Sequence, residues 1–263
     1  GLGREFALQF SAAGSRLALC DLDMDGLAET QRLTGDDGSR VSLHTVNVSD
    51  RQQVNQFAEN AIAIHGAVDI LINNAGITLT PQVFTDIPPA QFDKVMAINF
   101  SGVYNGIHAF LPHLLQRTEA SIVAISSLGG LVGLYGYSPY CASKFAVSGL
   151  CESLQSELAG TAVSVLLVHP GGVKTDLMRN APNLESTSAR EAADFTFRRG
   201  ALQTPQQVVG KTLKAMRKNK RQIILGADAR AVYAMRRLLP RRFPSLVRMI
   251  FSQVMFGSEG NNP

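Results

Sequence analysis

The sequence predicts an α/β fold, a Rossmann-type doubly wound parallel sheet in a single domain that spans residues 1–263. Short apolar runs alternate along the chain with helical patterns, which is typical of βαβ units around a parallel sheet. Several runs end in polar or glycine-containing segments, as expected at the ligand crevice of such a sheet. With 263 residues, 45% of them hydrophobic and 17% charged, the chain can bury one large core.

The order of elements follows from these runs and from the signals between them. Pro89 and Pro205 near helix starts, and Gly160 after a helix end, follow the usual asymmetry of helix termini. The expected strands cover residues 16–20, 41–46, 68–72, 121–125, 163–168 and 222–225. The expected helices cover residues 4–13, 24–33, 51–65, 89–115, 139–158 and 205–218.

The N-terminal turn, Gly1-Leu2-Gly3, runs directly into a helical stretch. A glycine turn that opens a helix requires a preceding strand to form a dinucleotide-binding site. We therefore expect the sequence to begin inside such a turn, with the first strand of the sheet missing from it. Gly1, Leu2 and Gly3 are then candidate cofactor-binding residues.

An acidic residue follows the next strand. Asp21 lies 18 residues after Gly3, at a strand end where a carboxylate hydrogen-bonds the adenosine ribose of a dinucleotide. Its charge would repel a 2′-phosphate, which favours NAD over NADP as the cofactor. The alternative is that Asp21 or Asp23 only caps the helix that starts near Met24.

The run 68–72 is followed by Asn74-Ala75-Gly76. Small residues at the carboxyl end of a strand allow the adenosine of a cofactor to approach closely. Asn and Gly are also common in plain strand-to-loop turns, which is the alternative interpretation. The whole motif in this position favours the functional one.

Asn47 and Val48 end another expected strand and are candidates for contact with the adenine edge. Capping of the following helix by Ser49 or Asp50 explains this polar stretch equally well.

A Pro-Gly turn follows strand 163–168. Such a turn frees backbone amides and carbonyls to meet a flat carboxamide ring, and a threonine can bond a phosphate or an amide. A purely structural turn explains the segment equally well when it is taken by itself. The cofactor-binding candidates in it are Pro170, Gly171, Val173 and Thr175.

The most informative pattern pairs a phenol with an ammonium. Tyr140 and Lys144 are four residues apart, so a helix brings them onto one face. A phenol near pKa 10 is a poor acid or base at neutral pH, and a neighbouring cation stabilises its phenolate. Ser127, thirteen residues before Tyr140, follows a strand and can reach into the same pocket. Together they describe a proton-transfer site for a carbonyl or an alcohol.

Asn99 lies inside the expected helix 89–115 among apolar neighbours. Asn is a mediocre residue for a helix interior. Its amide is therefore either a satisfied buried group or the holder of a water in a proton path.

The histidines and cysteines show no spacing typical of metal ligands, so no metal site is expected. Cys20, Cys141 and Cys151 are expected as free, mostly buried thiols in a reducing compartment. No signal peptide is visible, and no apolar run approaches the ~18 residues that span a bilayer. The expected location is the cytoplasm.

The residues before Tyr140 predict an apolar substrate pocket. The polar segment 180–200 is expected to be a substrate lid, with a plain surface excursion as the alternative. The expected substrate contacts are Ser127, Leu128, Leu134 and Tyr140, with Leu131, Val132 and Tyr137 further along the pocket.

The net charge of +4 is mild, but basic residues gather in a C-terminal extension, 228–263. A solvated surface is the commonest fate of such a segment. Its mixture of Arg with Leu, Met, Ile and Phe also suits an amphipathic helix on a membrane surface, or one packed across an oligomer interface. No nucleic-acid partner is expected.

Taken together, these residues resemble the short-chain dehydrogenase/reductase family. Two departures from the family pattern are the absent leading Thr-Gly of the glycine turn and Asn47, where the family usually has Asp. Nothing after Asn180 is diagnostic of a substrate. The resemblance covers residues 1–176 and rests on the order and spacing of Gly1-Leu2-Gly3, Asp21, Asn74-Ala75-Gly76, Asn99, Ser127, Tyr140-x-x-x-Lys144 and Pro170-Gly171.

The resemblance implies a sheet of about seven strands in the complete protein, assembly as a homodimer or homotetramer, and catalysis by four residues. Tyr140 would exchange a proton with the substrate oxygen, and Lys144 would lower the Tyr140 pKa and bond the nicotinamide ribose. Ser127, selected over Ser126 by the spacing, would polarise the carbonyl. Asn99 would position a water that leads to Lys144.

The sequence thus predicts an oxidoreductase that interconverts a secondary alcohol and a ketone or aldehyde with NAD, on a hydrophobic small molecule. An NADP-dependent carbonyl or 3-oxoacyl reductase is the alternative within this chemistry. Alternatives from another class are a non-catalytic NAD-binding regulatory protein and a membrane-peripheral protein.

Overall fold

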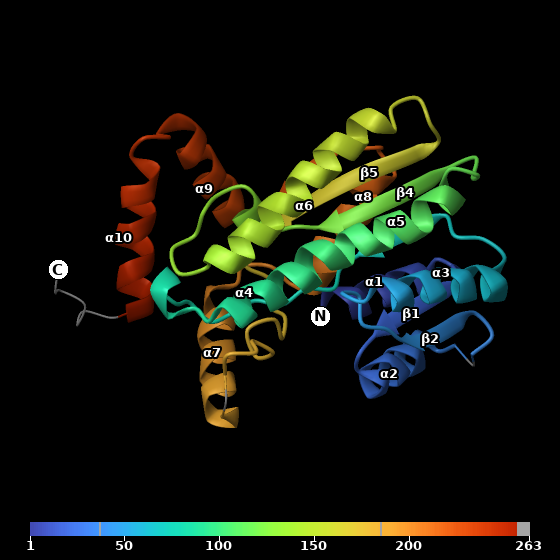
Figure 1. Ribbon diagram of the computed structural model, residues 1–263, viewed down its shortest axis with the longest axis horizontal. Coiled ribbons are helices and arrows are strands. Elements are labelled where there is room, and N and C mark those ends of the chain that lie inside the picture. Colours follow the sequence, from blue (N-terminus) through green and yellow to red (C-terminus); the bar gives the residue numbers. More distant parts are fainter. Residues whose placement is uncertain (37, 185, 257–263) are drawn as a thin grey trace.

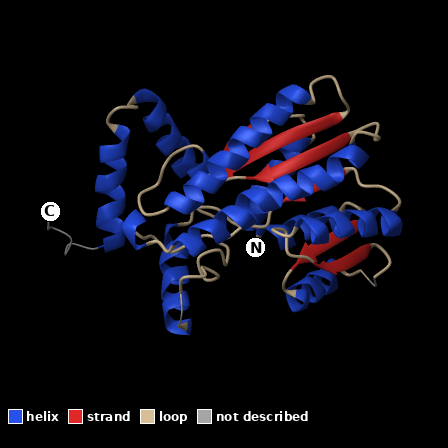
Figure 2. Cartoon of the chain, viewed as in Figure 1, coloured by secondary structure: helices blue, strands red, loops and turns tan. Residues whose placement is uncertain are grey.

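The strands of the computed structural model, which describes residues 1–36, 38–184 and 186–256, form two parallel sheets (Figures 1 and 2). One sheet pairs β1 (Leu17–Asp21) with β2 (Val41–Thr45). The other has the order β3-β4-β5-β6, with β3 (Ile70–Asn73), β4 (Ala120–Ile125), β5 (Val163–Pro170) and β6 (Gln222–Leu225). The predicted parallel α/β architecture is confirmed, with six strands among the described residues and no ladder between β1 and β3 there.

Ten α-helices connect and flank these strands in the described part of the chain. Two begin at predicted caps, because the side chains of Asp23 and Asp50 accept hydrogen bonds from the first free backbone N–H groups. The helices are α1 (Leu2–Ala12), α2 (Met24–Thr34), α3 (Arg51–His65), α4 (Pro89–Met96), α5 (Gly102–Leu114), α6 (Ser138–Glu157), α7 (Thr187–Gly200), α8 (Pro205–Met216), α9 (Ala227–Leu238) and α10 (Phe243–Phe256).

The single helix expected over 89–115 is interrupted. A π-helical turn, Ala97–Ser101, separates α4 from α5. A π turn places one extra residue in the helix, and such turns are frequent at functional sites. Here the extra residue turns Asn99 inward, where it is fully buried.

The core consists of two apolar layers on opposite faces of the larger sheet. Ile122 and Ala124 of β4 pack toward α3, α5 and α6, whereas Val123 and Ile125 pack toward α1 and α8. Residues of β5 alternate in the same way. This alternation buries both faces of the parallel strands, as a doubly wound fold requires. In Figure 1, α5 and α6 lie in front of β4 and β5, and α8 lies behind them.

The C-terminal extension forms a third cluster beside the sheet. Val132, fully buried in the loop after β4, packs with Phe243 and Val247 of α10, and Val232 and Met235 of α9 join them. Figure 1 shows α9 and α10 side by side at the end of the molecule remote from β1 and β2. Residues 257–263 of the expected extension lie outside the described residues. No helix among the described residues is long and apolar enough to cross a membrane.

Candidate active site

Tyr140 and Lys144 lie one turn apart on α6, as their spacing predicts. The Lys144 Nζ atom is 5.8 Å from the centre of the Tyr140 ring and donates a hydrogen bond to the Ile125 carbonyl at 2.9 Å. Burial lowers the pKa of Lys144 to about 8. Burial raises the pKa of Tyr140 to about 12, and a hydrogen bond with the Ser127 side chain works against that rise. The expected lowering of the Tyr140 pKa by Lys144 is therefore not seen in this geometry.

Ser127 stands at the end of β4 and faces Tyr140. Its Oγ atom accepts a hydrogen bond from the Gly129 amide at 3.1 Å, which begins a 3₁₀ turn, Leu128–Gly130. A Cβ atom on Gly129 would lie 3.2 Å from the Tyr140 ring, so glycine there lets the ring approach Ser127. Ser126 is 3% exposed, and its hydroxyl is hydrogen-bonded to the Lys144 carbonyl. The geometry thus brings Ser127, and not Ser126, to the phenol.

Asn99 joins the loop after β3 to α6. Its Oδ1 accepts from the Ile77 amide at 2.8 Å, and its Nδ2 donates to the Ile77 carbonyl at 2.9 Å. The same Nδ2 donates to the Ser143 hydroxyl at 3.0 Å, which donates in turn to the Tyr140 carbonyl. These partners favour the satisfied-amide alternative for Asn99, and they hold the backbone of Tyr140 in place.

The glycines predicted for the cofactor have structural reasons of their own. A Cβ atom on Gly3 would lie 2.9 Å from the Asn74 side chain. One on Gly76 would lie 3.2 Å from Asn99 Oδ1 and 3.4 Å from Lys144 Nζ. Because these two glycines have no side chain, α1, the loop after β3 and Lys144 can lie close together. Ala75, which lies between Asn74 and Gly76 in the sequence, is exposed.

Asp21 ends β1, and Asn47 lies two residues after the end of β2, at the same edge of the smaller sheet. One oxygen of the exposed Asp21 carboxylate accepts from the Leu22 and Asp23 amides. Asp23 caps α2, so the cap does not need Asp21. Asn47 Oδ1 accepts from the amide and hydroxyl of Ser49, which shapes the turn into α3, and Val48 lies against Gly102 of α5.

The turn after β5 is fixed by α9. Asp228, in the first turn of α9, accepts from the Gly172 amide at 2.9 Å, and its carboxylate fills the space that a Cβ atom on Gly171 would need. Pro170 and Val173 are buried. Thr175 lies beside Gly1, with side-chain atoms 3.9 Å from the position of a Gly1 Cβ. The turn therefore meets the N-terminus of α1, as a cofactor cradle requires.

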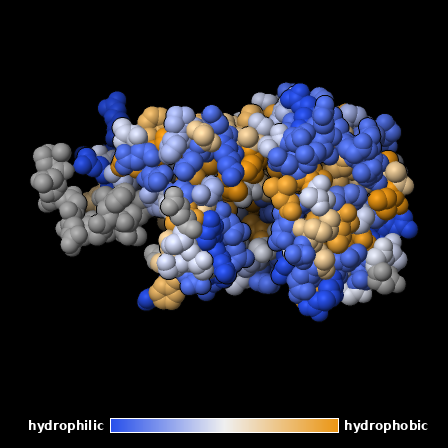
Figure 3. Space-filling view, turned by 60° about the horizontal axis from the view of Figure 1, so that its bottom comes forward, coloured by the Kyte–Doolittle hydropathy of each residue, from blue (hydrophilic) through white to orange (hydrophobic). Residues whose placement is uncertain are grey.

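This cradle fits a dinucleotide. Gly1, the Thr175 side chain and the α1 N-terminus meet at one place, and Asp21 ends the neighbouring strand β1. Figure 3 shows a hollow between the part of the surface formed by α7 and the part formed by β1, β2 and α2. Figure 1 marks the N-terminus of the chain between α7 and the strands β1 and β2.

The loop after Ser127 carries the leucines that the sequence predicts for the substrate pocket. Leu128, Leu131 and Leu134 pack against the cluster of Val132 with α9 and α10. Arg236 of α9 donates to the Leu131 carbonyl. A pocket of about 520 Å³ lies between Leu134, α6 and the C-terminal helices. The C-terminal extension therefore supports the expected substrate wall, which its sequence did not indicate.

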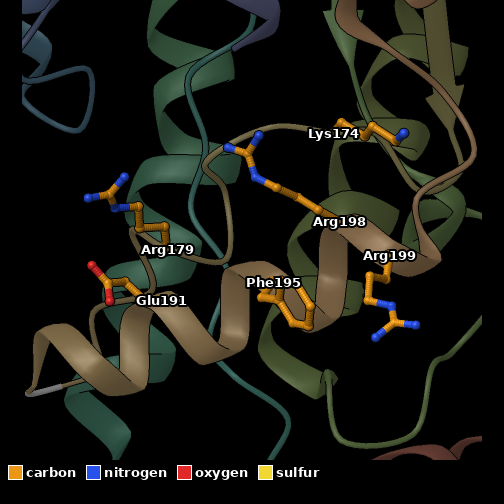
Figure 4. Close-up of a pocket in the computed structure, with 6 residues that line it drawn as sticks. All are labelled: Lys174, Arg179, Glu191, Phe195, Arg198 and Arg199. Carbon is orange, nitrogen blue, oxygen red and sulfur yellow. The ribbon is translucent and has the colours of Figure 1, made fainter.

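The expected lid contains α7. A pocket of about 530 Å³ runs along this helix, lined by Lys174, Arg179, Glu191, Phe195, Arg198 and Arg199 (Figure 4). In Figure 4, Arg198 extends from α7 away from Phe195 and Arg199. It forms an ion pair with Asp176 at 2.6 Å. Residue 185 of the expected lid lies outside the described residues.

Comparison with known proteins identifies the family of this chain. The family described as short chain dehydrogenase matches residues 1–185. The chain belongs to this family. A Mycobacterium tuberculosis protein named SadH, an oxidoreductase candidate by its description, is 37% identical over 253 residues, covering 94% of this chain and 90% of its own.

Two further comparisons cover nearly the whole chain. Dehydrogenase/reductase SDR family member 7B of Bos taurus is 34% identical over 251 residues, covering 92% of this chain and 76% of its own. A short-chain dehydrogenase/reductase from Burkholderia phymatum, solved in complex with NAD, has a TM-score of 0.77 at 27% identity, covering 100% of this chain and 93% of that one. As a short-chain dehydrogenase, this protein is an oxidoreductase of a family that uses nicotinamide cofactors.

The sequence did not predict two polar contacts of this short-chain dehydrogenase. Asn183 accepts from the Thr80 amide at 2.9 Å and donates to the Thr80 hydroxyl, which ties the lid to the loop after β3. His169 is fully buried next to Ser127. The partners of each are more than 40 positions away, so no local pattern could have indicated them. The buried polar residue His169 inside an apolar strand was the one available signal.

Proposed function

We propose that this short-chain dehydrogenase interconverts a secondary alcohol and a ketone or aldehyde with NAD(H), on a hydrophobic small molecule. The observation that carries the proposal is the grouping of Ser127, Tyr140 and Lys144 at the carboxyl end of the larger sheet. A hydroxyl donor, a phenol and an ammonium in one partly enclosed site suit proton transfer to a carbonyl oxygen.

Each of the three residues has its own role in the proposed reaction. Tyr140 passes its proton to the substrate oxygen during reduction and takes it back during oxidation. Ser127 donates a hydrogen bond to the same oxygen and so polarises the carbonyl. Lys144, an ammonium below its pKa of about 8, stabilises negative charge on the phenol and holds the cofactor ribose. The bound nicotinamide supplies or accepts the hydride at the substrate carbon.

The cofactor is proposed to be NAD. The Asp21 carboxylate is exposed at the end of β1, where it suits a ribose with two free hydroxyls and repels a 2′-phosphate. The proposed contacts beyond the catalytic pair are Gly1, Leu2, Gly3, Asp21, Asn47, Val48, Asn74, Ala75, Gly76, Pro170, Gly171, Val173 and Thr175. Comparison of kcat/KM for NADH and NADPH tests this, and a preference for NADPH contradicts it.

The proposed substrate is hydrophobic. Leu128 and Leu134 follow Ser127 directly, and the wall that carries them is backed by apolar residues of α9 and α10. Such a lining favours steroid, retinoid, fatty or cyclic ketones over sugars. A substrate panel with both cofactors tests this. Turnover of polyols or 3-oxoacyl thioesters, without activity on lipophilic ketones, contradicts it.

A membrane contact through the C-terminal extension is a second proposal. The turn between α9 and α10 exposes every residue from 237 to 242, including Leu238 at 78% and the cations Arg237, Arg241 and Arg242. This combination suits anionic lipid headgroups. Co-sedimentation with phosphatidylserine vesicles, compared with an L238S/R241S/R242S variant, tests it. Equal sedimentation of both proteins contradicts it.

Assembly and location complete the proposal. The family implies a homodimer or homotetramer, and the mass of the purified protein by light scattering tests this. All three cysteines are free thiols, which supports a reducing compartment such as the cytoplasm. Localisation of the tagged full-length protein tests that part.

Tyr140→Phe separates an enzyme from a regulatory NAD-binding protein. The enzyme should lose on the order of 10² to 10⁴ in kcat, because the proton donor is gone. Its affinity for NADH, measured by fluorescence titration, should stay within about twofold. A wild-type protein that binds NADH and turns over no substrate of the panel would favour the regulatory alternative.

A further inference from the structure

We propose that His169, held by Gln222, is a positioning residue that fixes the peptide of Ser127 so that its hydroxyl faces Tyr140. The inference rests on the proposed function, since it assigns a role within the same site. It concerns the backbone of Ser127, which follows β4, and the side chains of His169 near the end of β5 and Gln222 at the start of β6.

The first observation is the burial of His169. Its side chain is fully buried near the end of β5, among apolar residues of that strand. A buried imidazole needs a partner for each ring nitrogen, because an unmade hydrogen bond there costs free energy. His169 has both partners, and they come from different strands.

The second observation is the direction of the two bonds. His169 Nδ1 lies 2.9 Å from the Ser127 carbonyl, which can only accept, so Nδ1 carries the proton. His169 Nε2 lies 2.9 Å from Gln222 Nε2, which donates, so Nε2 is the acceptor. The Ser127 carbonyl thus fixes the proton on Nδ1, and the NH₂ group of Gln222 satisfies the other ring nitrogen of this neutral tautomer.

The third observation is that β5 lacks a backbone N–H donor beside the chain that leaves β4. The β4–β5 ladder ends with the Ser126 amide donating to the Val168 carbonyl. Pro170 has no N–H, so β5 offers no further backbone donor to the chain that leaves β4. The His169 ring supplies one. With the Gly130 amide, it fills both acceptor positions of the Ser127 carbonyl.

Burial keeps the His169 ring neutral. It is the main cause that lowers the pKa of His169 to about 4; the hydrogen bond with the Ser127 carbonyl works against this, and repulsion by Lys144 adds a smaller lowering. A neutral His169 can therefore act beside the catalytic ammonium without disturbing it. No other titratable group contributes to this shift among the described residues.

The consequence for catalysis is that the Ser127 hydroxyl is held in a precise position. The Gly129 amide holds the Ser127 Oγ atom and His169 holds its carbonyl, so both ends of the residue are fixed. A misplacement of about 1 Å in such a group can cost on the order of 10²-fold in rate. Loss of His169 should lower kcat with little change in NADH affinity.

Three variants at one position test the donor geometry. His169→Asn keeps an N–H near the Nδ1 position, His169→Gln moves it outward, and His169→Leu removes it at similar volume. We expect kcat to fall at least about tenfold for Leu and Gln, and to recover to within about threefold of wild type for Asn. Equal kcat for Asn and Leu, at equal melting temperature, would overturn the inference.

A double-mutant cycle with Ser127→Ala separates positioning from general damage. If His169 acts through Ser127, His169→Leu should change kcat less than about twofold in the Ser127→Ala background. If His169→Leu lowers kcat by the same factor in the wild-type and Ser127→Ala backgrounds, its effect is independent of Ser127 and structural. NADH affinity and melting temperature of all four proteins complete the cycle.

Nitrogen NMR of the histidine ring tests the geometry without turnover. We expect the His169 ring to be neutral and protonated at Nδ1 at pH 6. Gln222→Leu should change the nitrogen chemical shifts of this ring. A ring protonated at Nε2 would overturn the inference whatever the activity. An inactive wild type with the expected tautomer would refute the proposed function and the catalytic role of His169, and leave the proton assignment standing.

Discussion

Lys144 places its ammonium 5.8 Å from the centre of the Tyr140 ring and donates to the Ile125 carbonyl instead. The pair is therefore on one helix face, yet the phenol is left with a pKa of about 12 by its burial. One N–H group of the ammonium is bound by the protein backbone at the end of β4. The proposed mechanism requires this charge to act on the phenol, so Lys144 is the residue whose removal should be most informative.

Lys144→Met keeps the length of the apolar stem and removes the charge. We expect kcat to fall on the order of 10² to 10⁴, because Tyr140 loses the cation beside its ring. NADH affinity should fall as well, unlike in Tyr140→Phe, if Lys144 holds the ribose. Steady-state kinetics with fluorescence titration of NADH measures both effects. Unchanged NADH affinity would remove the ribose role.

Gly76→Ala should crowd the catalytic centre. The new methyl group would lie 3.2 Å from Asn99 Oδ1 and 3.4 Å from Lys144 Nζ, so those groups must move by a few tenths of an ångström. We expect kcat to fall several-fold with a small loss of stability. Gly149→Ala on α6 is the matched control, since a Cβ atom there meets nothing within 4 Å. Equal activity of the two variants would contradict the prediction.

Asp21→Ala should relax the choice of cofactor. Without the carboxylate, repulsion of a 2′-phosphate disappears and the hydrogen bonds to the ribose are lost. The ratio of kcat/KM for NADH over NADPH should fall at least about tenfold, which equals about 1.4 kcal/mol. Asp23→Ala is the control, because Asp23 caps α2 and should change melting temperature more than cofactor choice.

Asn183→Ala should loosen the lid. The variant removes both hydrogen bonds to Thr80, which join the segment before α7 to the loop after β3. We expect KM for the substrate to rise several-fold with a smaller change in kcat, because closure becomes less favourable. Asn180→Ala, at an exposed position of the same segment, should have no such effect. A rise in KM for both variants would show that the contact is not specific.

His169 should make stability depend on pH. Its folded-state pKa of about 4 lies below the ordinary value of 6.5, so the unfolded chain takes up a proton in a window where the folded chain does not. The neutral His169 therefore contributes at most about 3 kcal/mol to the free energy of unfolding. This contribution is fully present above pH 6.5 and is lost as pH falls toward 4. Urea unfolding of wild type and His169→Asn at several pH values measures it. Parallel pH curves would contradict the assignment.

The sequence predicted those parts of the site that depend on local spacing. Tyr140 and Lys144 share a face because four residues make about one helical turn. Ser127 was separable from Ser126 by its distance from Tyr140, and Ser126 proves to be buried against α6. Asp21 was predicted to end its strand, and it does.

Contacts between distant segments could not be predicted in this way. The bond between Asn183 and Thr80 spans 103 positions, and that between His169 and Ser127 spans 42. The packing of α9 and α10 against Val132 likewise joins the last segment to the middle of the chain. Apolar periodicity reveals that a helix is amphipathic but does not reveal which surface it will cover.

The π turn at Ala97–Ser101 makes the number of residues in this stretch matter more for the site than for the fold. A π turn takes up one extra residue while the α-helices on either side keep their phase, so a one-residue deletion within the turn would restore ordinary winding without turning α5. Val103 and Ile107 would stay buried, but Asn99 would leave the place from which it bonds Ile77 and Ser143. Deletion scanning across the turn should therefore lower activity more than it lowers stability.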